Sequence, residues 1–430
     1  MMNGGFKWLL PGMRVKRWVA LILLGLLLVL MAILLWDPWS LVTVENAMHD
    51  WILRHSLDKR WIALFAGVVG VGASIIGVQK MIHSIVEAVS PNEVEHLAER
   101  VYRKRSLERG PHIVVIGGGT GLSTLLRGLK AYSSNITAIV TVADDGGSSG
   151  RIREELGILP PGDIRNTLVA LADTEPLMER LFQYRFSWGE GLVGHSFGNL
   201  FIAAMTDITG NFETAIKASS RVLAVGGVVL PSTLSKVRLK ATYTDGSEVI
   251  GESQIPLAGK KIERISLIPA EVKPLPEALS AIEKADLIVL GPGSLYTSVI
   301  PNLLVQDICD ALVASRALKV YVCNVMTQPG ETDGMSASDH IKALFQHAQN
   351  KTIFSYTLLN NQRLTPGQAR KYTSHHAYPI KNDLEEIRKL QVIPICAPLL
   401  DRSELVRHDS ELLARALMKL LADVHAQAKS

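Results

Sequence analysis

This sequence has few cysteines and little net charge. Its 430 residues include three cysteines, Cys309, Cys323 and Cys396, which lie far apart and form no CxxC pair. A disulfide framework or a cysteine-based zinc site is therefore not expected. The formal net charge is +4, and residues 1–36 contain four cations and no acid, so the rest of the chain is neutral overall. A strongly basic nucleic-acid surface is not expected, because phosphate neutralisation needs a local excess of Lys and Arg.

Several enzyme signatures are also missing. The sequence contains neither HExxH nor GxxxxGK[ST], which argues against zinc metalloproteases and P-loop NTPases. No repeat of 20–50 residues is visible either. The chain is 47% apolar and 20% charged, a composition that can bury a core and does not favour disorder.

Two long uncharged runs stand near the N-terminus. Residues 18–36 and 61–79 contain no charged side chain, and about 20 helical residues cross the hydrocarbon layer of roughly 30 Å. A cleaved signal peptide is the alternative for the first run, but the run is too long for one, Trp36-Asp37-Pro38 is a poor small-residue cleavage site, and a second run follows. We predict a transmembrane hairpin within residues 1–80, and a lipid bilayer as one partner.

The charges flanking the runs predict the orientation of the hairpin. Cations without acids precede the first run, and further Lys and Arg follow the second. The loop 37–60 between them contains both acidic and basic residues. The positive-inside rule then places both termini and the main domain in the cytoplasm, at the cytoplasmic membrane. Residues 81–110 read as a linker helix with a short apolar stripe, which suits either a solvated spacer or a homodimer contact.

Residues 111–430 have the pattern of an α/β domain, in which short apolar runs alternate with helical patterns. This pattern predicts a mostly parallel sheet with helices on both faces. Residues 236–250 instead alternate apolar with polar side chains and turn at Asp245-Gly246. We therefore place a small antiparallel insertion at about 222–265. The expected strands are 112–116, 136–142, 286–290, 319–323, 352–359 and 391–395; the expected helices are 120–131, 164–184, 197–205, 276–284, 303–315, 336–347 and 403–426.

The first strand runs into a glycine-rich turn and then a helix, at residues 112–126. Glycines allow a close approach to a ligand, and a helix N-terminus favours phosphate. The pattern is not a literal GxGxxG, because Leu122 takes the last glycine position. Asp144 and Asp145 end the second expected strand. Beside a phosphate, such carboxylates would bind hydroxyls or a hard cation such as Mg²⁺, or else form a solvated acidic turn.

Other polar runs stand at the ends of strands and the starts of helices. The run GDIRN begins a helix, with Asp163 as a candidate N-cap, and GHSFGN precedes another. His195 is a candidate general base, phosphate ligand or structural hydrogen-bonder, and we favour the last two roles. Residues 291–298 form a second glycine turn after a strand, where Tyr296 either stacks on a base or packs in the core. Residues 323–332 follow a third strand and are rich in donors and acceptors.

Taken together, six runs resemble the YvcK/CofD-like family, and its YvcK branch of gluconeogenesis factors in particular: IGGGTGLSTLLRGLK, VADDGGSSGRIREELG, PPGDIRNTLVALAD, GHSFGNLFIAA, GPGSLYTSVIPNLL and YVCNVMTQPGETDGMSASDH. The resemblance extends from His112 to the C-terminus. It implies a modified Rossmann-like nucleotide-binding fold. Carried over residue by residue, it implies ligand contacts from Gly118, Gly119, Thr120, Gly121, Asp144, Asp145, Asn166, His195, Asn199, Gly291, Gly293, Ser294, Tyr296, Asn324, Thr327, Gln328 and Glu331.

Three functions are compatible with this resemblance and with the residues. The YvcK branch implies a regulatory protein that binds UDP-sugars such as UDP-N-acetylglucosamine and supports cell shape and envelope synthesis during gluconeogenic growth. The CofD branch implies a Mg²⁺-dependent transferase of the 2-phospho-L-lactate transferase type, acting on a nucleotide-diphosphate-activated donor, with Asp144 or Asp145 as candidate catalytic residues and Asp145 as the metal ligand. An NAD-dependent oxidoreductase is the third. No base–nucleophile pair decides the matter, so we favour the regulatory binding protein and expect no cofactor other than Mg²⁺.

Overall fold

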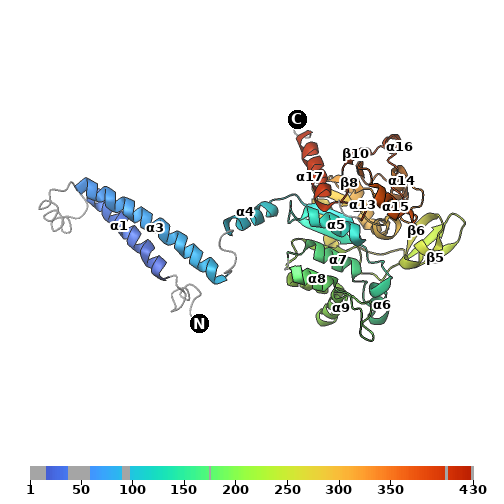
Figure 1. Cartoon of the computed structure of the whole chain (residues 1–430), viewed down its shortest axis with the longest axis horizontal. Helices are drawn as coiled ribbons and strands as arrows, with labels where there is room; N and C mark the ends of the chain where they lie inside the picture. Colours follow the sequence, from blue (N-terminus) through green and yellow to red (C-terminus); the bar gives the residue numbers. More distant parts are fainter. Residues whose placement is uncertain (1–15, 37–58, 90–96, 174–175, 402–404, 428–430) are drawn as a thin grey trace. The chain divides into compact units, whose positions relative to one another are not determined.

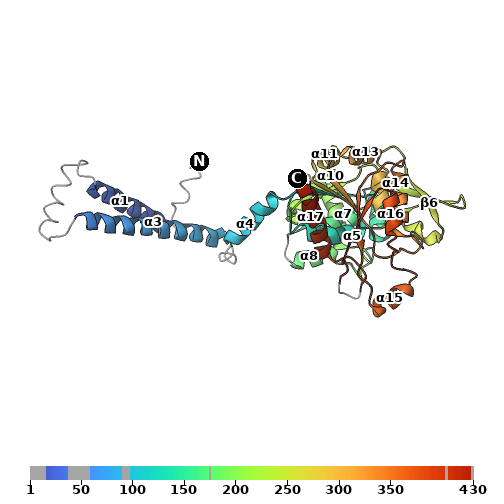
Figure 2. The same ribbon diagram turned by 90° about the horizontal axis from the view of Figure 1, so that it is seen from above.

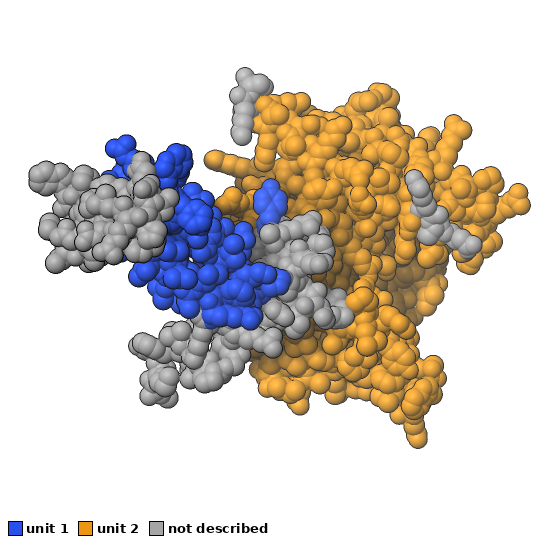
Figure 3. Space-filling model, turned by 60° about the vertical axis from the view of Figure 1, so that its left-hand side comes forward, with its two compact units in different colours: residues 1–104 blue, residues 105–430 orange. Residues whose placement is uncertain are grey.

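Both uncharged runs form long helices, α1 (Lys16–Trp36) and α3 (Lys59–Val89) (Figure 1). The computed structural model describes residues 16–36, 59–89, 97–173, 176–401 and 405–427. Most of the predicted outer loop 37–60 lies outside these residues. The chain divides into two units, residues 1–104 and 105–430 (Figure 3). Residues 17–36 and 60–84 are long and apolar enough to span a membrane, with mean hydropathies of 3.1 and 2.2.

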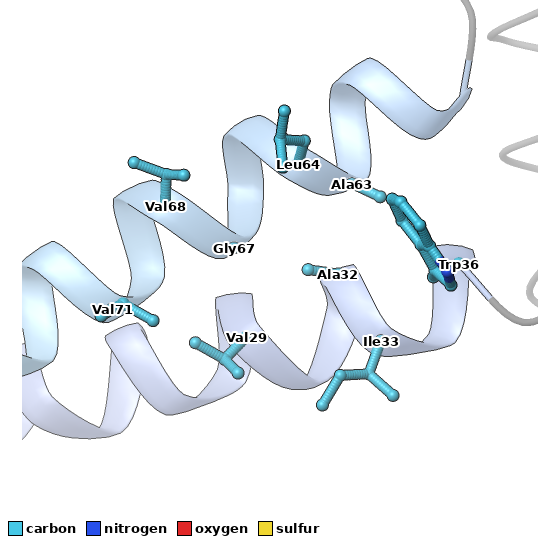
Figure 4. Close-up of a pocket in the computed structure, with 9 residues that line it drawn as sticks. All are labelled: Val29, Ala32, Ile33, Trp36, Ala63, Leu64, Gly67, Val68 and Val71. Atoms are coloured by element: carbon cyan, nitrogen blue, oxygen red, sulfur yellow. The ribbon is translucent and has the colours of Figure 1, made fainter.

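Glycines bring α1 and α3 into close contact in the first unit. A Cβ atom at Gly25 would lie 2.3 Å from Ser74 Oγ, and one at Gly70 would lie 2.7 Å from the Gly25 carbonyl oxygen. Such small-residue contacts are typical of helices that pair within a bilayer. Toward Trp36 the two helices line an open apolar groove of about 480 Å³ (Figure 4). Large apolar side chains point outward, among them Leu27 and Phe65, as expected of helices surrounded by lipid.

Seven parallel strands form the central sheet of the second unit, in the order β10-β9-β8-β7-β1-β2-β3. Every residue of β1 and β7 is buried, so both faces of the sheet are covered. This confirms the predicted fold class. The strands are β1 (Ile113–Gly117), β2 (Ile136–Val140), β3 (Val228–Pro231), β7 (Leu287–Leu290), β8 (Leu318–Val322), β9 (Tyr356–Asn360) and β10 (Ile393–Ala397).

Two groups of helices pack around this sheet. In the first, α5 (Gly119–Leu129) contacts both α7 (Gly162–Leu171) and α17 (Ser410–Gln427). In the second, α13 (Gln306–Ala314) contacts α11 (Pro276–Lys284) and α12 (Ile300–Leu303). The other helices are α4 (Leu97–Glu108), α6 (Gly147–Leu156), α8 (Pro176–Gln183), α9 (Phe197–Thr209), α10 (Phe212–Val222), α14 (Ala337–His347), α15 (Pro366–Thr373) and α16 (Leu384–Lys389), with short turns η3 (Glu252–Gln254), η4 (Pro256–Ala258) and η5 (Leu295–Val299).

A separate antiparallel sheet of β4 (Arg238–Tyr243), β5 (Glu248–Ile250) and β6 (Ile262–Ile268) has the order β5-β4-β6. Its first hairpin turns at Asp245-Gly246 as predicted, and Gly246 has a φ of 80°. In both Figure 1 and Figure 2 it lies at the side of the domain opposite α17. The predicted bounds of 222–265 are corrected to 238–268, because β3 pairs with β2 in the parallel sheet. The apolar run of β3 lacks the alternation of a half-exposed strand, which fits this placement.

Two predicted helices are divided in the structure. The expected helix 164–184 is interrupted between α7 and α8, since Pro176 cannot continue a helix. The expected linker helix 81–110 is shared between the end of α3 and α4, with residues 90–96 outside the described residues. Helices α6, α10, α15 and α16 were not predicted. Of these, α6 begins with Gly147-Ser148-Ser149-Gly150, a composition typical of turns.

Candidate functional site

The order of the parallel strands creates one crevice at the carboxyl edge of the sheet. From β1 the chain proceeds through β2 to β3 on one side, whereas from β7 it proceeds through β8 and β9 to β10 on the other. Neighbouring strands whose connections diverge in this way form the switch point at which α/β proteins bind ligands. The turns after β1 and β7 are the two glycine turns predicted from the sequence.

The two glycine turns are in direct contact. A Cβ atom at Gly121 would lie 2.6 Å from the Pro292 carbonyl oxygen, and Gly119 has a φ of 69° that favours glycine. Gly118 is the N-cap of α5 and has no side chain that could cap the helix. The first N–H of the helix, that of Gly119, donates to the Asp163 carboxylate, and the next N–H groups of the first turn have no partner within the helix. Thr120 lies exposed in that first turn. This geometry suits an anionic group at the start of α5.

Beside these turns lies a polar pocket of about 220 Å³. The helices α6 and α7 begin at its wall, and neither has a side-chain cap. Two more uncapped helix starts therefore add N–H donors and positive potential. We call it the acidic pocket; its lining residues are Asp144, Gly146, Gly147, Ser148, Ser149, Gly162, Asp163, Arg165, Asn166, Arg185 and Asn199.

Two arginines stand close together in the acidic pocket. Burial, and next the neighbouring Arg185, lower the pKa of Arg165. Arg165 donates to Ser196 Oγ and, over 2.7 Å, to Asn166 Oδ1, while its buried Nε has no partner within the described residues. Arg185 donates to the Gly194 carbonyl oxygen. Adjacent cations with an unused buried donor are an arrangement that an anion would stabilise.

Asn199 closes another wall of the pocket. Its Nδ2 donates to Ser148 Oγ at 3.1 Å, and its buried Oδ1 accepts no hydrogen bond from the described residues. His195 lies behind this wall, is buried, and has Nδ1 3.1 Å from Ser148 Oγ. Of the roles predicted for His195, hydrogen bonding within the protein is the one that these contacts support. Asn166 and Asn199 reach the pocket directly.

The paired aspartates point in different directions. Asp144 lines the acidic pocket and accepts from its own turn at Gly146 N–H over 2.9 Å. Asp145 instead accepts the N–H groups of Glu252 and Ser253, at 3.0 and 2.9 Å, because successive side chains of an extended segment alternate. The structure therefore gives Asp145 an anchoring role on the small sheet and leaves Asp144 as the aspartate of the pair that faces the pocket.

Asp163 provides a second pocket carboxylate, although the sequence suggested only an N-cap. The N-cap of α7 is Pro161, so the capping assignment is corrected. Burial, reinforced by Asp144, raises the pKa of Asp163 to about 7. Burial also raises the pKa of Asp144, and burial followed by Asp144 and Asp145 raises that of Glu252 to about 8. These carboxylates repel one another without a cation or proton.

Mg²⁺ is the cation that the family resemblance implies. Among the described residues, no three His, Cys, Asp or Glu side chains are placed to hold a metal ion on their own. Mg²⁺ is commonly bound by one or two carboxylates together with water and substrate phosphates. Asp144 and Asp163, beside an anion-binding wall, fit this mode of binding. They would hold the ion, which would neutralise charge on a bound phosphate.

The loop after β8 forms a buried cluster next to η5. Glu331 accepts from Thr297 Oγ1 over 3.2 Å and also from Gln328 Nε2, and its Oε2 has no partner in the described part of the chain. Burial raises the pKa of Glu331 to about 7. Tyr296 is 5% exposed and contacts the ring of His347 edge-on. Tyr296 therefore packs in the core, the second of the roles considered for it.

Other residues of this loop support its shape. Asn324 bonds both backbone groups of Gly293, through Oδ1 at 3.2 Å and Nδ2 at 2.7 Å. Thr327 pairs with the backbone of Tyr378, donating its N–H to the carbonyl oxygen over 2.7 Å and accepting the Tyr378 N–H at Oγ1 over 2.9 Å. Ser294 is the N-cap residue of η5, and Gly291 turns with a φ of 73°. These contacts place Asn324, Thr327 and Gln328 in structural roles around the second glycine turn.

The sequence-based list missed residues that complete the pocket. Arg165 lies in the GDIRN run directly before Asn166, the residue of this run for which the family resemblance predicts a ligand contact. Arg185 lies outside all of the quoted runs and reaches the site through a short antiparallel bridge to Ser196. The other arginines of the acidic turn serve the backbone: Arg151 donates to Val193 O and Arg153 to Val237 O.

A family model, two related proteins and a crystal structure all match this chain and point to the same family. Residues 113–400 match the family described as 2-phospho-L-lactate transferase CofD. The gluconeogenesis factor of Bacillus subtilis is 51% identical over 73% of this chain and 99% of its own length. A protein from Nostoc sp. is 47% identical over 98% of this chain and 94% of its own, so that match includes the N-terminal helices. A crystal structure of a Bacillus halodurans protein is similar with a TM-score of 0.70 and 52% identity, covering 72% of this chain and all of its own.

Proposed function

Because this chain belongs to the CofD/YvcK family, we propose that it is a regulatory protein that binds a nucleotide sugar, in particular a UDP-sugar, from the cytoplasmic side of the membrane. Relatives that carry the name gluconeogenesis factor are matched over almost their whole length. The proposed role is to support cell shape and envelope synthesis during gluconeogenic growth. Expression in a Bacillus subtilis strain lacking its own factor, grown on a gluconeogenic carbon source, tests this role.

The observation that carries the binding proposal is the mixed charge of the acidic pocket. Arg165 and Arg185 lie near uncapped helix starts, which suits phosphate oxygens. Asp144 and Asp163 line the same pocket, and burial raises the pKa of both carboxyl groups. A site that combines cationic and carboxylate groups suits a diphosphate accompanied by Mg²⁺. The glycine turns next to it permit close backbone approach to the same group.

Thermal-shift measurements on the purified chain test the ligand class. We expect stabilisation by UDP-N-acetylglucosamine or UDP-glucose that exceeds stabilisation by GDP or NAD, with a further increase when Mg²⁺ is present. Arg185→Ala should weaken UDP-sugar binding at least about tenfold, the effect of losing one charge-assisted contact of about 1.4 kcal/mol or more. Arg180→Ala is the matched control, because Arg180 lies exposed on α8 outside the pocket lining. Stabilisation by NAD alone would contradict the proposal and favour an oxidoreductase.

A transferase of the kind named by the family description is the second candidate. Asp144 and Asp163 favour it, since two carboxylates beside a phosphate site could hold the Mg²⁺ that such a transfer uses. The two functions differ in turnover. Stoichiometric binding with no release of nucleoside diphosphate supports the regulatory protein. Continuous release from a nucleotide-diphosphate-activated donor, abolished by Asp163→Asn, supports the transferase.

Membrane tethering by α1 and α3 is part of the proposal. The length and hydropathy of both helices support it, as do the outward-facing apolar side chains. The full chain should stay in the membrane fraction after alkaline carbonate washing, whereas residues 105–430 should be soluble. A protease added to intact cells should leave residues 105–430 intact; cleavage of that domain would contradict the cytoplasmic location.

A further inference from the structure

A second cavity, of about 310 Å³, opens at the carboxyl edge of the parallel sheet beyond β8 and β9. We call it the amide pocket, because five of its eleven lining residues carry side-chain amides. It lies on the opposite side of the switch point from the acidic pocket, since β8 and β9 extend from β7 while β2 and β3 extend from β1. Its lining residues are Asn324, Val325, Asn360, Asn361, Gln362, Arg363, Leu364, Ala369, Pro379, Ile380 and Asn382.

Contacts through the glycine turns connect the two pockets. Asn324, in the wall of the amide pocket, bonds Gly293 through both side-chain atoms. A Cβ atom at Gly293 would lie 3.1 Å from the Gly118 carbonyl oxygen. One at Gly118 would lie 2.5 Å from Oδ2 of Asp163, which lines the acidic pocket. The glycine turns therefore lie between the two pockets, so a ligand with its phosphates on the glycines would extend into both.

The lining of the amide pocket has the character of a nucleobase site. Val325, Leu364 and Ile380 provide apolar walls for a flat ring. Asn382 donates from Nδ2 to the Asn360 carbonyl oxygen over 2.8 Å, which leaves its Oδ1 as an acceptor. The side chain of Asn361 is exposed, and its backbone N–H bonds Ala397 O, so the amide itself can serve a ligand.

The chemistry of these groups selects among bases. An amide presents one donor face and one acceptor face, which match the carbonyl and the N–H of an imide edge such as that of uracil. Guanine offers two adjacent N–H donors, which a carboxylate accepts best, and none of the lining residues is acidic. Arg363, exposed at the rim, provides a planar cation that can stack on a base.

We infer that the amide pocket seats the base of the nucleotide ligand and prefers a pyrimidine with an imide edge, whereas the acidic pocket takes the phosphate and sugar end. This inference rests on the proposed nucleotide-sugar function. It adds the direction in which the ligand lies across the switch point and the residues that select its base.

Calorimetric titration of the full chain tests the inference with UDP-glucose, GDP and Mg²⁺-pyrophosphate as probes. The double variant Asn361→Ala with Arg363→Ala should bind UDP-glucose about tenfold more weakly, yet bind Mg²⁺-pyrophosphate within twofold of the unaltered chain. Arg370→Ala is the matched control, because Arg370 is exposed on α15 and outside the pocket lining. Arg185→Ala should weaken both probes.

Three results would overturn the inference. The double variant could leave UDP-glucose binding unchanged, it could weaken both probes equally, or the unaltered chain could bind GDP more tightly than UDP-glucose. In the first two cases the unaltered chain still binds UDP-glucose and Mg²⁺-pyrophosphate, so the proposed function stands and only the assignment of the base site fails. In the third case the expected preference for UDP-sugars over GDP fails as well. If neither UDP-glucose nor Mg²⁺-pyrophosphate binds the unaltered chain, the proposed function fails as well, which separates the two failures.

Discussion

Replacing Asp163 by asparagine should stabilise the ligand-free protein, and more so at high pH. The carboxyl pKa rises from 3.8 to about 7 on folding, so between these values the folded state binds more protons than the unfolded one. Stability associated with this group is therefore present below pH 3.8 and is lost as the pH rises through 7. Three pKa units at about 1.36 kcal/mol each give a cost of about 4 kcal/mol at pH 8. At pH 5 only about 2 kcal/mol has been lost, because that pH exceeds 3.8 by about one unit.

Asp163→Asn removes this cost, and its Oδ1 can still accept the Gly119 N–H that the carboxylate accepts. At roughly 2 °C per kcal/mol for a large domain, we expect the melting temperature to rise by about 8 °C at pH 8 and by about half as much at pH 5. Calorimetry of the ligand-free chain at both pH values measures this. The control Asp207→Asn removes an exposed charge from α9 and should shift neither value appreciably. An equal rise at both pH values, or a fall at pH 8, would refute the reasoning.

The remaining predictions concern packing and buried charge. Gly121→Ala places a Cβ 2.6 Å from a backbone oxygen and should lower the free energy of unfolding by about 2 kcal/mol in urea titrations. The control Gly367→Ala, which has no atom within 4 Å of its Cβ, should change the free energy of unfolding by less than about 1 kcal/mol. Equal effects of the two variants would contradict the close contact of the glycine turns. Burial lowers the pKa of His408 from 6.5 to about 4, so the unfolded state binds more protons than the folded state between these pH values. Acidification from pH 6.5 to 4 should therefore lower the free energy of unfolding by about 3 kcal/mol. His408→Leu should reduce the dependence of this free energy on pH in that range, and an unaltered dependence would show that another group causes the acid sensitivity. Gly25→Leu should lower the melting temperature of the α1–α3 hairpin in detergent, because its Cβ would lie 2.3 Å from Ser74 Oγ. The control Gly72→Leu places its Cβ in open space and should leave the melting temperature unchanged. Similar melting temperatures of the two variants would contradict tight packing at Gly25.

The parallel sheet and both glycine turns were predictable from the sequence. Continuous apolar runs bounded by glycine identify buried strands, and β1 and β7 are such runs. β3 was harder, because it is four residues long and ends in Pro231. Proline suits an edge strand but does not mark one. The pairing of β3 with β2 depends on tertiary contacts that no local pattern encodes.

The acidic pocket was predictable in part. Asp144, Asn166 and Asn199 were selected because they occur in recognisable runs, and all three line the pocket. Asp163 was assigned to capping, since an aspartate at a helix start has a sufficient local explanation. Arg185 comes from a loop without any pattern and reaches the site only through folding. Alternation along the extended turn, which separates Asp144 from Asp145, could have been anticipated from strand geometry.

The small antiparallel sheet and its η3 segment make buried contacts with the rest of the domain. Its η3 segment presents the two N–H groups that Asp145 accepts, and Ile265 N–H donates to His347 Nε2 of α14 over 2.9 Å. Deleting residues 238–268 would leave the Asp145 carboxylate and the buried His347 imidazole without these partners. It would also remove the fully buried residues Leu239, Ala241 and Ile265 from the hydrophobic core. A shortened version of this protein must therefore keep residues 238–268, although they form a separate sheet outside the parallel one.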